Sequence, residues 1–288
     1  MPLPFKPTIT SFSADNALYL ATASNIAYSG ETASARSLAD DLGLTQDFRF
    51  FSFPATDTEA VAAATPTHAV LAFRGTEQKK FKDWMTDLSA TPSAFRWFFS
   101  SAPDVGSIHA GFGHAIHDSW GPVIDWLKAH GPNTGRTLWL TGHSLGGALA
   151  AVAASACTFD PASRLPINGI YTYGQPRFAL HDFSLNYDAQ LRNRHFRFVN
   201  RKDLVPRVPF RGWDYADPGQ MIHFDSNGVP HLESPHWNGF LSRTLSSFGE
   251  FFGMITHLGG DIADHSITNG YIASIRPRLA DLDTLPFR

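Results

Sequence analysis

The 288-residue sequence contains a single cysteine, Cys157, so no disulfide can form within the chain. The residue lies in the alanine-rich stretch 148–156, just before Thr158. A lone cysteine in such a place is typical of a small buried side chain that fills space in a helix interface. We therefore expect Cys157 to be chemically inert.

The sequence also has no excess of basic residues over acidic ones. Lysine and arginine together number 23, against 26 aspartate and glutamate residues, which gives a formal net charge of -3. Nucleic-acid-binding domains carry a basic surface, so we expect no nucleic acid partner and no strong attraction to anionic membranes. The sequence also gives no reason to expect a cofactor or a metal ion.

Long apolar runs are absent. No run of about 18 apolar residues occurs anywhere, which excludes a transmembrane helix and leaves only peripheral membrane contact. The first eight residues lack the basic and apolar segments of a signal peptide. The compartment therefore stays open: secreted if a signal was removed from the chain, cytoplasmic otherwise.

Strand-like apolar runs alternate with helical segments, which predicts one α/β domain. The domain is expected to have an N-terminal lead at 1–12, a loop region rich in aromatic residues at about 77–99 and a C-terminal tail at 276–288. Strands are expected at 48–53, 67–73, 137–141, 167–173 and 194–200, with a hairpin edge at 220–228. Helices are expected at 14–28, 37–42, 79–88, 109–127 (kinked or restarted at Gly121-Pro122), from 147 onward, and in a last segment ending at 275.

The most informative stretch is Gly142-His-Ser144-Leu-Gly146, between an apolar run and a small-residue helix. A strand, a Gly-x-Ser-x-Gly turn and a helix form the nucleophile elbow of α/β-hydrolases, which exposes the serine on a strained turn. Glycines are needed there because the turn and the following helix pack closely against their neighbours. The alternative is an ordinary strand–turn–helix in which Ser144 caps the helix.

A serine nucleophile needs a histidine base, and the base needs a carboxylate that orients it. In α/β-hydrolases the order along the chain is Ser, Asp or Glu, His. Asp203 directly follows a buried strand, at the sheet edge where ligands gather, and is the predicted acid. Its alternative role is that of a turn or helix-cap aspartate. The other aspartates considered lie in turn-like surroundings: Asp182, Asp188, Asp214, Asp217 and Asp225.

Two histidines near the C-terminus are the main candidates for the base. His265 lies in a polar segment with Asp261 and Asp264, whereas His257 follows an apolar stretch that is more typical of a packed side chain. His265 is therefore the predicted base, and His257 is the alternative. His143, inside the elbow, is expected to pack or to hydrogen-bond behind the serine. The less favoured histidines are His223, His231 and His236.

An oxyanion formed during acyl transfer needs hydrogen-bond donors. The N–H of Leu145, the residue after the serine, is the predicted first donor. Thr76, just past the strand at 67–73, is the predicted second donor through its N–H and its hydroxyl; a plain turn at Arg74-Gly75-Thr76 is the alternative.

Downstream, a short amphipathic helix is predicted at 79–88 because its apolar residues have helical spacing: Phe81, Trp84, Met85 and Leu88.

Seven short motifs follow one another in order: Phe73-Arg-Gly-Thr76, Trp84-Met-Thr-Asp-Leu88, His109-Ala-Gly-Phe112, Gly142-His-Ser-Leu-Gly-Gly-Ala-Leu-Ala150, Tyr173-Gly-Gln-Pro-Arg177, Asn200-Arg-Lys-Asp203-Leu-Val-Pro206 and Asp264-His265. This series resembles the class 3 triacylglycerol lipases of the filamentous-fungal type, over about residues 15–275. The resemblance implies an α/β-hydrolase fold: a mostly parallel central sheet, helices on both faces and a short helical lid.

The resemblance also implies an activity: cleavage of carboxylic ester bonds of acylglycerols through an acyl-enzyme, without cofactor or metal. Ser144, Asp203 and His265 would form the triad, with Thr76 and Leu145 as the oxyanion hole. The segment after Thr76 would be a lid, and Asp87 would hydrogen-bond the oxyanion threonine in the open state. The apolar face of the lid, which would meet a lipid–water interface, would carry Phe81, Trp84, Met85 and Leu88. A core-facing helix is the alternative for that segment.

Two features depart from the fungal pattern. Secreted fungal members have disulfides and signal peptides, and the gap from Thr76 to Trp84 is slightly longer here, so compartment, lid length and substrate range stay open. Within the same fold the alternatives are a phospholipase A1, a feruloyl or short-chain carboxylesterase and an acyltransferase. The aromatic cluster at 95–99 would suit a fatty acyl chain or an aryl acid equally well. A remote alternative is a catalytically silent binding protein.

Overall fold

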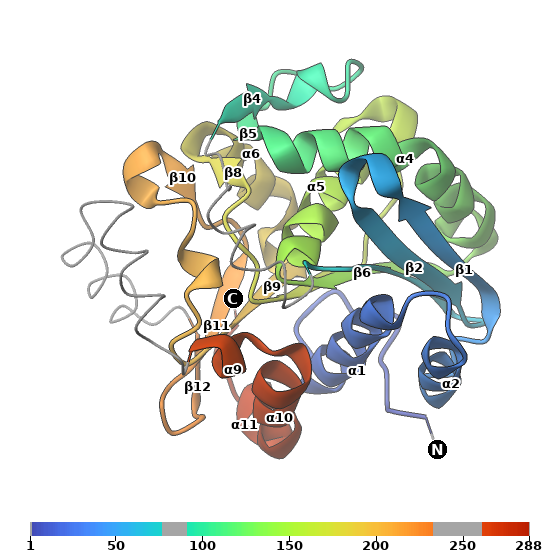
Figure 1. The fold of residues 1–288 in the computed structure, drawn as a ribbon, viewed down its shortest axis with the longest axis vertical. Coiled ribbons are helices and arrows are strands. Elements are labelled where there is room, and N and C mark those ends of the chain that lie inside the picture. Colours follow the sequence, from blue (N-terminus) through green and yellow to red (C-terminus); the bar gives the residue numbers. More distant parts are fainter. Residues whose placement is uncertain (1, 77–90, 233–260, 288) are drawn as a thin grey trace.

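The computed structural model describes residues 2–76, 91–232 and 261–287. Within these residues, a central sheet runs through the molecule in the order β1-β2-β3-β6-β7-β9-β11-β12 (Figure 1). Its strands are β1 (Gln46–Phe53), β2 (Thr58–Ala64), β3 (His68–Phe73), β6 (Thr137–His143), β7 (Gly169–Tyr173), β9 (His195–Asn200), β11 (Gln220–Phe224) and β12 (Pro230–Leu232).

The middle of the sheet is parallel. β3, β6, β7, β9 and β11 pair in parallel with their neighbours, whereas β1, β2 and β12 join the two edges in antiparallel register. The carboxyl ends of the parallel strands therefore lie along one edge of the sheet, where α/β proteins build their sites. The mostly parallel sheet of an α/β-hydrolase fold is confirmed.

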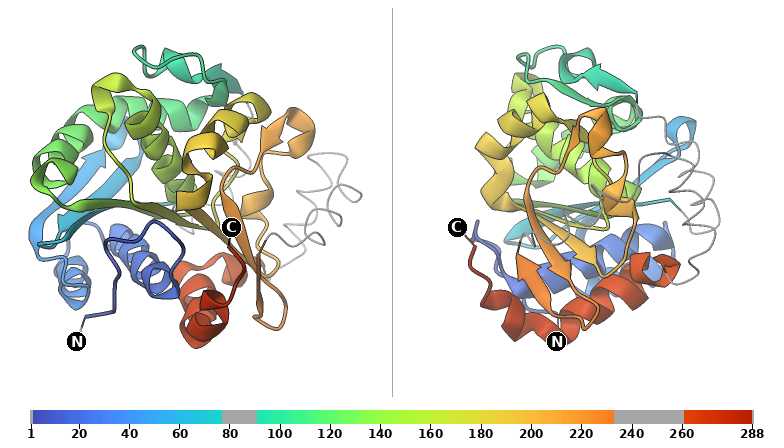
Figure 2. Two further views of the ribbon diagram at one scale, coloured as in Figure 1. Left: turned by 180° about the vertical axis from the view of Figure 1, so that it is seen from behind. Right: turned by 90° about the vertical axis from the view of Figure 1, so that its left-hand side faces the viewer.

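Helices cover both faces of the sheet (Figure 2). One face carries α4 (Ala110–His130), α5 (Leu145–Phe159) and α6 (His181–Leu191). The other carries α1 (Ala14–Ile26), α2 (Ala33–Asp41), α10 (Ala273–Ile275) and α11 (Leu279–Asp283), with α9 (Asp261–His265) at its end. Short 3-10 turns connect these elements: η1 (Ala27–Ser29), η2 (Pro54–Thr56), η3 (Phe95–Trp97), η4 (Pro132–Thr134), η5 (Pro161–Ser163), η6 (Arg192–Arg194), η7 (Val205–Arg207), η8 (Arg211–Trp213) and η10 (Arg276–Arg278).

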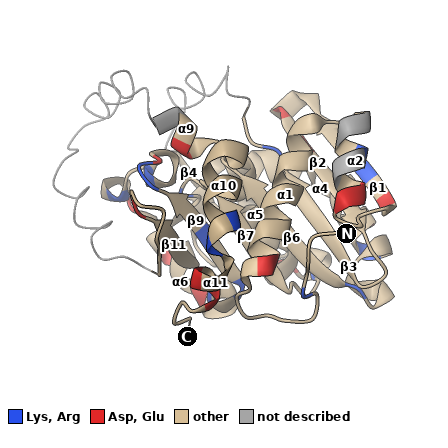
Figure 3. Ribbon diagram, turned by 90° about the horizontal axis from the view of Figure 1, so that it is seen from below, with Lys and Arg blue, Asp and Glu red and all other residues tan. Residues whose placement is uncertain are grey.

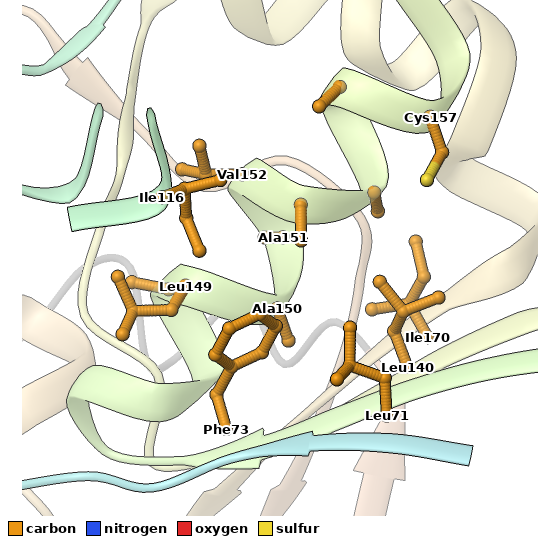
Figure 4. Close-up of a cluster of buried hydrophobic side chains, with 14 of the residues drawn as sticks. Leu71, Phe73, Ile116, Leu140, Leu149, Ala150, Ala151, Val152, Cys157 and Ile170 are labelled. Atoms are coloured by element: carbon orange, nitrogen blue, oxygen red, sulfur yellow. The ribbon is translucent and has the colours of Figure 1, made fainter. Parts of the chain in front are cut away.

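Each face of the sheet has its own apolar core. In the first, the alanine-rich α5 lies against aliphatic side chains of β3, β6 and β7 (Figure 4). Cys157 is part of this core, and burial raises the pKa of its thiol to about 12. The prediction that the cysteine is buried is confirmed, and its inertness stays a prediction. The second core joins α1 to the opposite face through large aromatic side chains, among them Tyr19, Trp139, Tyr171 and Phe196.

Several predicted elements are present with small changes in their bounds. The predicted strands correspond to β1, β3, β6, β7 and β9, and the hairpin edge corresponds to β11 and β12. The first helix is capped by Ser13, as predicted, whereas α2 starts four residues earlier than expected, after the cap Thr32. α4 continues as one helix through Pro122, which lies on the exposed face. Proline has no N–H, so one carbonyl of the preceding turn receives no hydrogen bond within the helix, and on this face that carbonyl is exposed to water.

The structure also contains elements that the sequence did not indicate. β2 is rich in alanine, a residue depleted in strands, and it forms because β1 and β3 pair with it on both sides. A small second sheet has the order β10-β8-β5-β4, and its strands are only two or three residues long: β4 (Pro92–Ala94), β5 (Ser107–His109), β8 (Ala179–Leu180) and β10 (Tyr215–Ala216).

The aromatic stretch 95–99 is divided between core and surface. Phe95, Phe98 and Phe99 are buried in the first core, whereas Trp97 is 78% exposed. The predicted C-terminal tail is also packed: Leu282 is buried, and the ring of Phe287 stacks on Phe12. Most of the face formed by α1, α10 and α11 is neither acidic nor basic, and its few charged positions are scattered (Figure 3).

Candidate functional site

Ser144 lies at the junction of β6 and α5, at the carboxyl edge of the parallel sheet. Its backbone has φ 59° and ψ -132°, a conformation that non-glycine residues rarely adopt. The Ser144 N–H donates to the carbonyl of Tyr173 at 2.9 Å, which ties the turn to the end of β7. A strained serine between a buried strand and a helix is the geometry of a nucleophile elbow.

Close backbone packing explains the two outer glycines of the motif. A Cβ atom on Gly142 would overlap the carbonyl of Gly146, and a Cβ atom on Gly146 would overlap the carbonyl of Phe73. The first turn of α5 therefore lies directly against the end of β3. This contact brings the loop Arg74-Gly75-Thr76 next to the elbow.

The two predicted oxyanion donors come from these touching segments. Leu145 is the first residue of α5, where the N–H has no acceptor within the helix and the helix dipole is positive. Thr76 follows β3 by three residues and is half-buried at the end of the first described segment. Both backbone segments thus face the same edge of the sheet as Ser144.

Asp203 and His265 are joined by a hydrogen bond. Asp203 follows β9 and is fully buried, and the Nδ1–H of His265, the last residue of α9, donates to its Oδ2 at 2.8 Å. The other carboxylate oxygen accepts from the Val205 N–H at 2.9 Å. With Nδ1 as the donor, the remaining ring nitrogen Nε2 of His265 is the one available as a base.

The His265 ring lies beside the elbow. It is 4.6 Å from the ring of His143, the residue before Ser144, measured between centroids. Gly174, at the end of β7, has φ +61°, and a Cβ atom there would come within 2.9 Å of both Asp203 Oδ2 and the His265 ring. A glycine at this position leaves room for the aspartate–histidine pair.

Tyr271 is a site residue that the sequence did not indicate. It lies in η9 (Ile267–Ile272), a π-helical turn just after His265, and its hydroxyl donates to Asp203 Oδ2 at 2.5 Å. The Tyr271 hydroxyl oxygen in turn accepts from the Asn200 N–H at 3.2 Å. Burial, and then the nearby Asp203 carboxylate, raises the pKa of Tyr271, so the phenol stays protonated and acts as a donor. π-helical turns occur often at functional sites, but such a turn can be recognised only in the structure. The sequence therefore carries no signal that singles out Tyr271.

The other candidate acids and bases have separate roles. Asp217 binds Arg177, Arg197 and Arg211; the remaining aspartates make turn contacts or a surface ion pair: Asp182, Asp188, Asp214 and Asp225. His223 contacts the carbonyl of Arg201, and His231 pairs with Asp225. His236 and His257 lie outside the described residues.

A family model describes this kind of chain. The model for the lipases of class 3 matches residues 70–213, which is half of the sequence and includes most of β3, the elbow and Asp203. The chain belongs to the class 3 lipase family. The match ends before His265, so the family model itself says nothing of that residue.

The curated relatives are distant in sequence and longer than this chain. The triacylglycerol lipase OBL1 of Arabidopsis thaliana is 28% identical over 200 residues, covering 54% of this chain and 37% of its own length. Phospholipase A1-II 1 of Oryza sativa subsp. indica is 31% identical over 99 residues, covering 34% of this chain and 25% of its own. The chain thus spans well under half the length of these relatives.

Solved structures of fungal lipases share the fold. A Rhizomucor miehei lipase in a propeptide complex matches with a TM-score of 0.61 and 23% identity, covering 76% of this chain and 69% of that chain. At this level of identity the match concerns the fold alone. The matched fold agrees with the parallel sheet and the flanking helices of this class 3 lipase.

Part of the predicted site lies outside the described residues of this class 3 lipase. The oxyanion-support residue Asp87 and the whole predicted lid face belong to segment 77–90: Phe81, Trp84, Met85 and Leu88. Among residues 2–76, 91–232 and 261–287, no group of His, Cys, Asp or Glu side chains could hold a metal ion. Within the same ranges no helix is both long and apolar enough to cross a bilayer.

Proposed function

We propose that this chain is a serine hydrolase that cleaves carboxylic esters of acylglycerols through an acyl-enzyme intermediate. The observation that carries the proposal is the position of Ser144 on a strained elbow, beside a histidine whose Nδ1–H is held by a buried aspartate. This arrangement converts a weak nucleophile into a reactive one. The chain's membership of a family of lipases supports the same chemistry.

In the first half of the proposed reaction, Ser144 Oγ attacks the ester carbonyl carbon and its proton passes to His265 Nε2. Asp203 stabilises the imidazolium that forms, and the N–H groups of Leu145 and Thr76 stabilise the negative charge on the carbonyl oxygen. Collapse of the intermediate breaks the ester C–O bond, and His265 returns the proton to the leaving alcohol.

In the second half, a water molecule gives a proton to His265 Nε2 and attacks the acyl carbon. Collapse of this second intermediate releases the carboxylic acid, and the proton returns to Ser144 Oγ. The net result is one ester and one water converted to one alcohol and one acid. No redox or cofactor step is needed.

A triacylglycerol is the favoured substrate because the Arabidopsis thaliana and Ricinus communis relatives are triacylglycerol lipases by name. We further propose that the segment after Thr76, within about residues 77–99, acts as the lid and that the substrate is met at a lipid–water interface. The rice phospholipase A1 relative keeps phospholipid open as a second substrate class.

The test is hydrolysis of p-nitrophenyl esters from acetate to palmitate, together with tributyrin and triolein emulsions and phosphatidylcholine vesicles. We expect turnover that extends to long chains and rises sharply above substrate solubility. Activity confined to soluble short esters would contradict the acylglycerol substrate, and release of fatty acid only from phosphatidylcholine would identify a phospholipase. The matched variants are Ser144→Ala, expected to be inactive, and Ser155→Ala within the following helix α5, expected to be fully active.

A further inference from the structure

His143 uses both of its ring nitrogens in hydrogen bonds. Nε2 lies 2.5 Å from the backbone carbonyl of His265, and Nδ1 lies 2.7 Å from the hydroxyl of Tyr28. A carbonyl can only accept, so Nε2 carries the proton, Nδ1 is an acceptor and the Tyr28 hydroxyl is the donor. His143 therefore connects Tyr28 to the backbone of the proposed base.

His143 is also held in its neutral form. Its ring is buried, and burial lowers its pKa well below the usual value for histidine, an effect that the neighbouring His265 strengthens. A second positive charge beside His265 is thus avoided when that base takes up the proton of Ser144. Both nitrogens of His143 are committed, so this ring does not compete with His265 as a base.

At its other end, Tyr28 contacts the loop that leads to Thr76. Tyr28 lies in η1, at the end of α1, and the Gly75 amide faces its oxygen, where it opposes the rise in the Tyr28 pKa that burial causes. A Cβ atom on Gly75 would overlap the Tyr28 hydroxyl and the His143 carbonyl, and would lie 2.9 Å from Ser144 Cβ. The loop thus has no free space against the tyrosine and the elbow.

These contacts form one continuous chain of groups: Gly75, Tyr28, His143 and the carbonyl of His265. We infer that Tyr28 and His143 are positioning residues, which together fix the base on α9 and the oxyanion loop after β3 relative to Ser144. The inference rests on the proposed function, since it assigns positions to the groups of that reaction. Acyl transfer tolerates errors of only about 0.5 Å in such groups, so a bridge of this kind affects the rate.

A matched control exists in the same fold. The Tyr187 hydroxyl lies 2.9 Å from His195 Nδ1, in a buried hydrogen-bonded tyrosine–histidine pair whose other ring nitrogen contacts Thr172. His195 is the first residue of β9, so this pair lies at the opposite, amino edge of the parallel sheet. Loss of the Tyr187 hydroxyl removes an equivalent hydrogen bond far from the site.

The experiment compares Tyr28→Phe with Tyr187→Phe, using a soluble p-nitrophenyl ester and the thermal unfolding midpoint. Loss of one hydrogen bond that positions reacting groups predicts a roughly tenfold lower kcat for Tyr28→Phe, with KM unchanged. Tyr187→Phe is expected to keep the wild-type kcat and to lower only the unfolding midpoint. Equal kcat losses in both variants, or none in Tyr28→Phe, would overturn the inference.

Two substitutions of His143 give a second, independent comparison. Glutamine places a donor near the position of Nε2, whereas phenylalanine has none, so His143→Gln should retain several times the kcat of His143→Phe. Because the two residues belong to one connected chain of contacts, the kcat loss in the double variant Tyr28→Phe/His143→Phe should be smaller than the product of the two single losses. Equal rates for the Gln and Phe variants, or additive losses in the double variant, would contradict the bridge.

Failure of the proposed function gives a different result. In that case the wild-type protein hydrolyses no ester and Ser144 does not react with a fluorophosphonate probe. If the wild type turns over and Ser144 is labelled, but the Tyr28 and His143 variants match the wild type, the proposed function stands and the positioning inference is wrong.

Discussion

The Nδ1–H of His265 donates to Asp203 Oδ2 at 2.8 Å, although the two residues are 62 positions apart in the sequence. One follows β9 and the other ends α9, so the bond joins two elements that meet only at the carboxyl edge of the sheet. Its direction fixes the tautomer of the ring. The proposed base therefore presents Nε2, and not Nδ1, to an attacking hydroxyl.

Replacing Asp203 by asparagine should lower kcat by about 10³- to 10⁴-fold while the fold is kept, because the amide can stabilise the wrong tautomer of His265, as in serine proteases. Steady-state kinetics on a soluble ester measure this effect. Asp160→Asn is the matched control, since Asp160 is also buried but binds Ser163 at the far end of α5. Near-normal turnover in Asp203→Asn would mean that another residue is the acid.

Tyr271→Phe should have a smaller effect. The Tyr271 hydroxyl supports the carboxylate and not the reacting atoms, so removing one hydrogen bond predicts a kcat roughly tenfold lower with an unchanged KM. Tyr171→Phe is the control: its hydroxyl accepts from the Ser13 N–H on the α1 side of the sheet. If both variants lose the same fraction of kcat, Tyr271 has no specific role in the site.

Two Gly→Ala substitutions should change stability with opposite signs. At Gly146 the new methyl group would overlap the carbonyl of Phe73, so the free energy of unfolding should fall by about 1–3 kcal/mol. At Gly212, exposed in η8, a new Cβ atom would meet no other group within 4 Å and the backbone is not left-handed, so alanine should raise it by about 0.4–1 kcal/mol. Urea denaturation measures both, and the same sign for the two would contradict the packing described.

The stability of the protein should depend on a buried histidine far from the site. His68 contacts Tyr19 and Thr65, and burial lowers its pKa to about 4. The unfolded state takes up a proton near pH 6.5 and the folded state only near pH 4. The stabilisation is therefore complete above pH 6.5 and is lost as the pH falls toward 4, by a total of about 3 kcal/mol.

The measurement is the free energy of unfolding of wild type and His68→Gln from pH 7.5 to 4. The wild type should lose more stability over this range, because glutamine does not titrate, and the two curves should be parallel above pH 7. Equal slopes across the acid range would show that His68 is not buried in its neutral form.

The sequence was sufficient for the main features of the fold. The apolar runs that became β3, β6, β7 and β9 are buried on both faces, and such strands show a continuous apolar pattern. β2 was missed because its alanines do not favour a strand, and it exists only through pairing with β1 and β3. The strands of the second sheet are too short to leave any pattern.

The residues of the candidate site likewise fall into those that the sequence predicts and those that only the structure reveals. Ser144 and Asp203 could be named because a strand end followed by a turn has a local signature, and His265 because of its polar surroundings near the C-terminus. Tyr28 and Tyr271 could not, since each acts through one side-chain contact across 115 and 68 residues, respectively. A local sequence pattern cannot predict which side chain of a helical segment will contact a residue so distant in the sequence.

The most direct measurement is the site of covalent modification by a fluorophosphonate ester, determined by mass spectrometry of the intact protein and of its peptides. We predict one adduct per chain, located on Ser144, absent in Ser144→Ala and formed much more slowly in His265→Ala. An adduct on any other residue, or full labelling and ester turnover in Ser144→Ala, would contradict the assignment of Ser144 as the nucleophile.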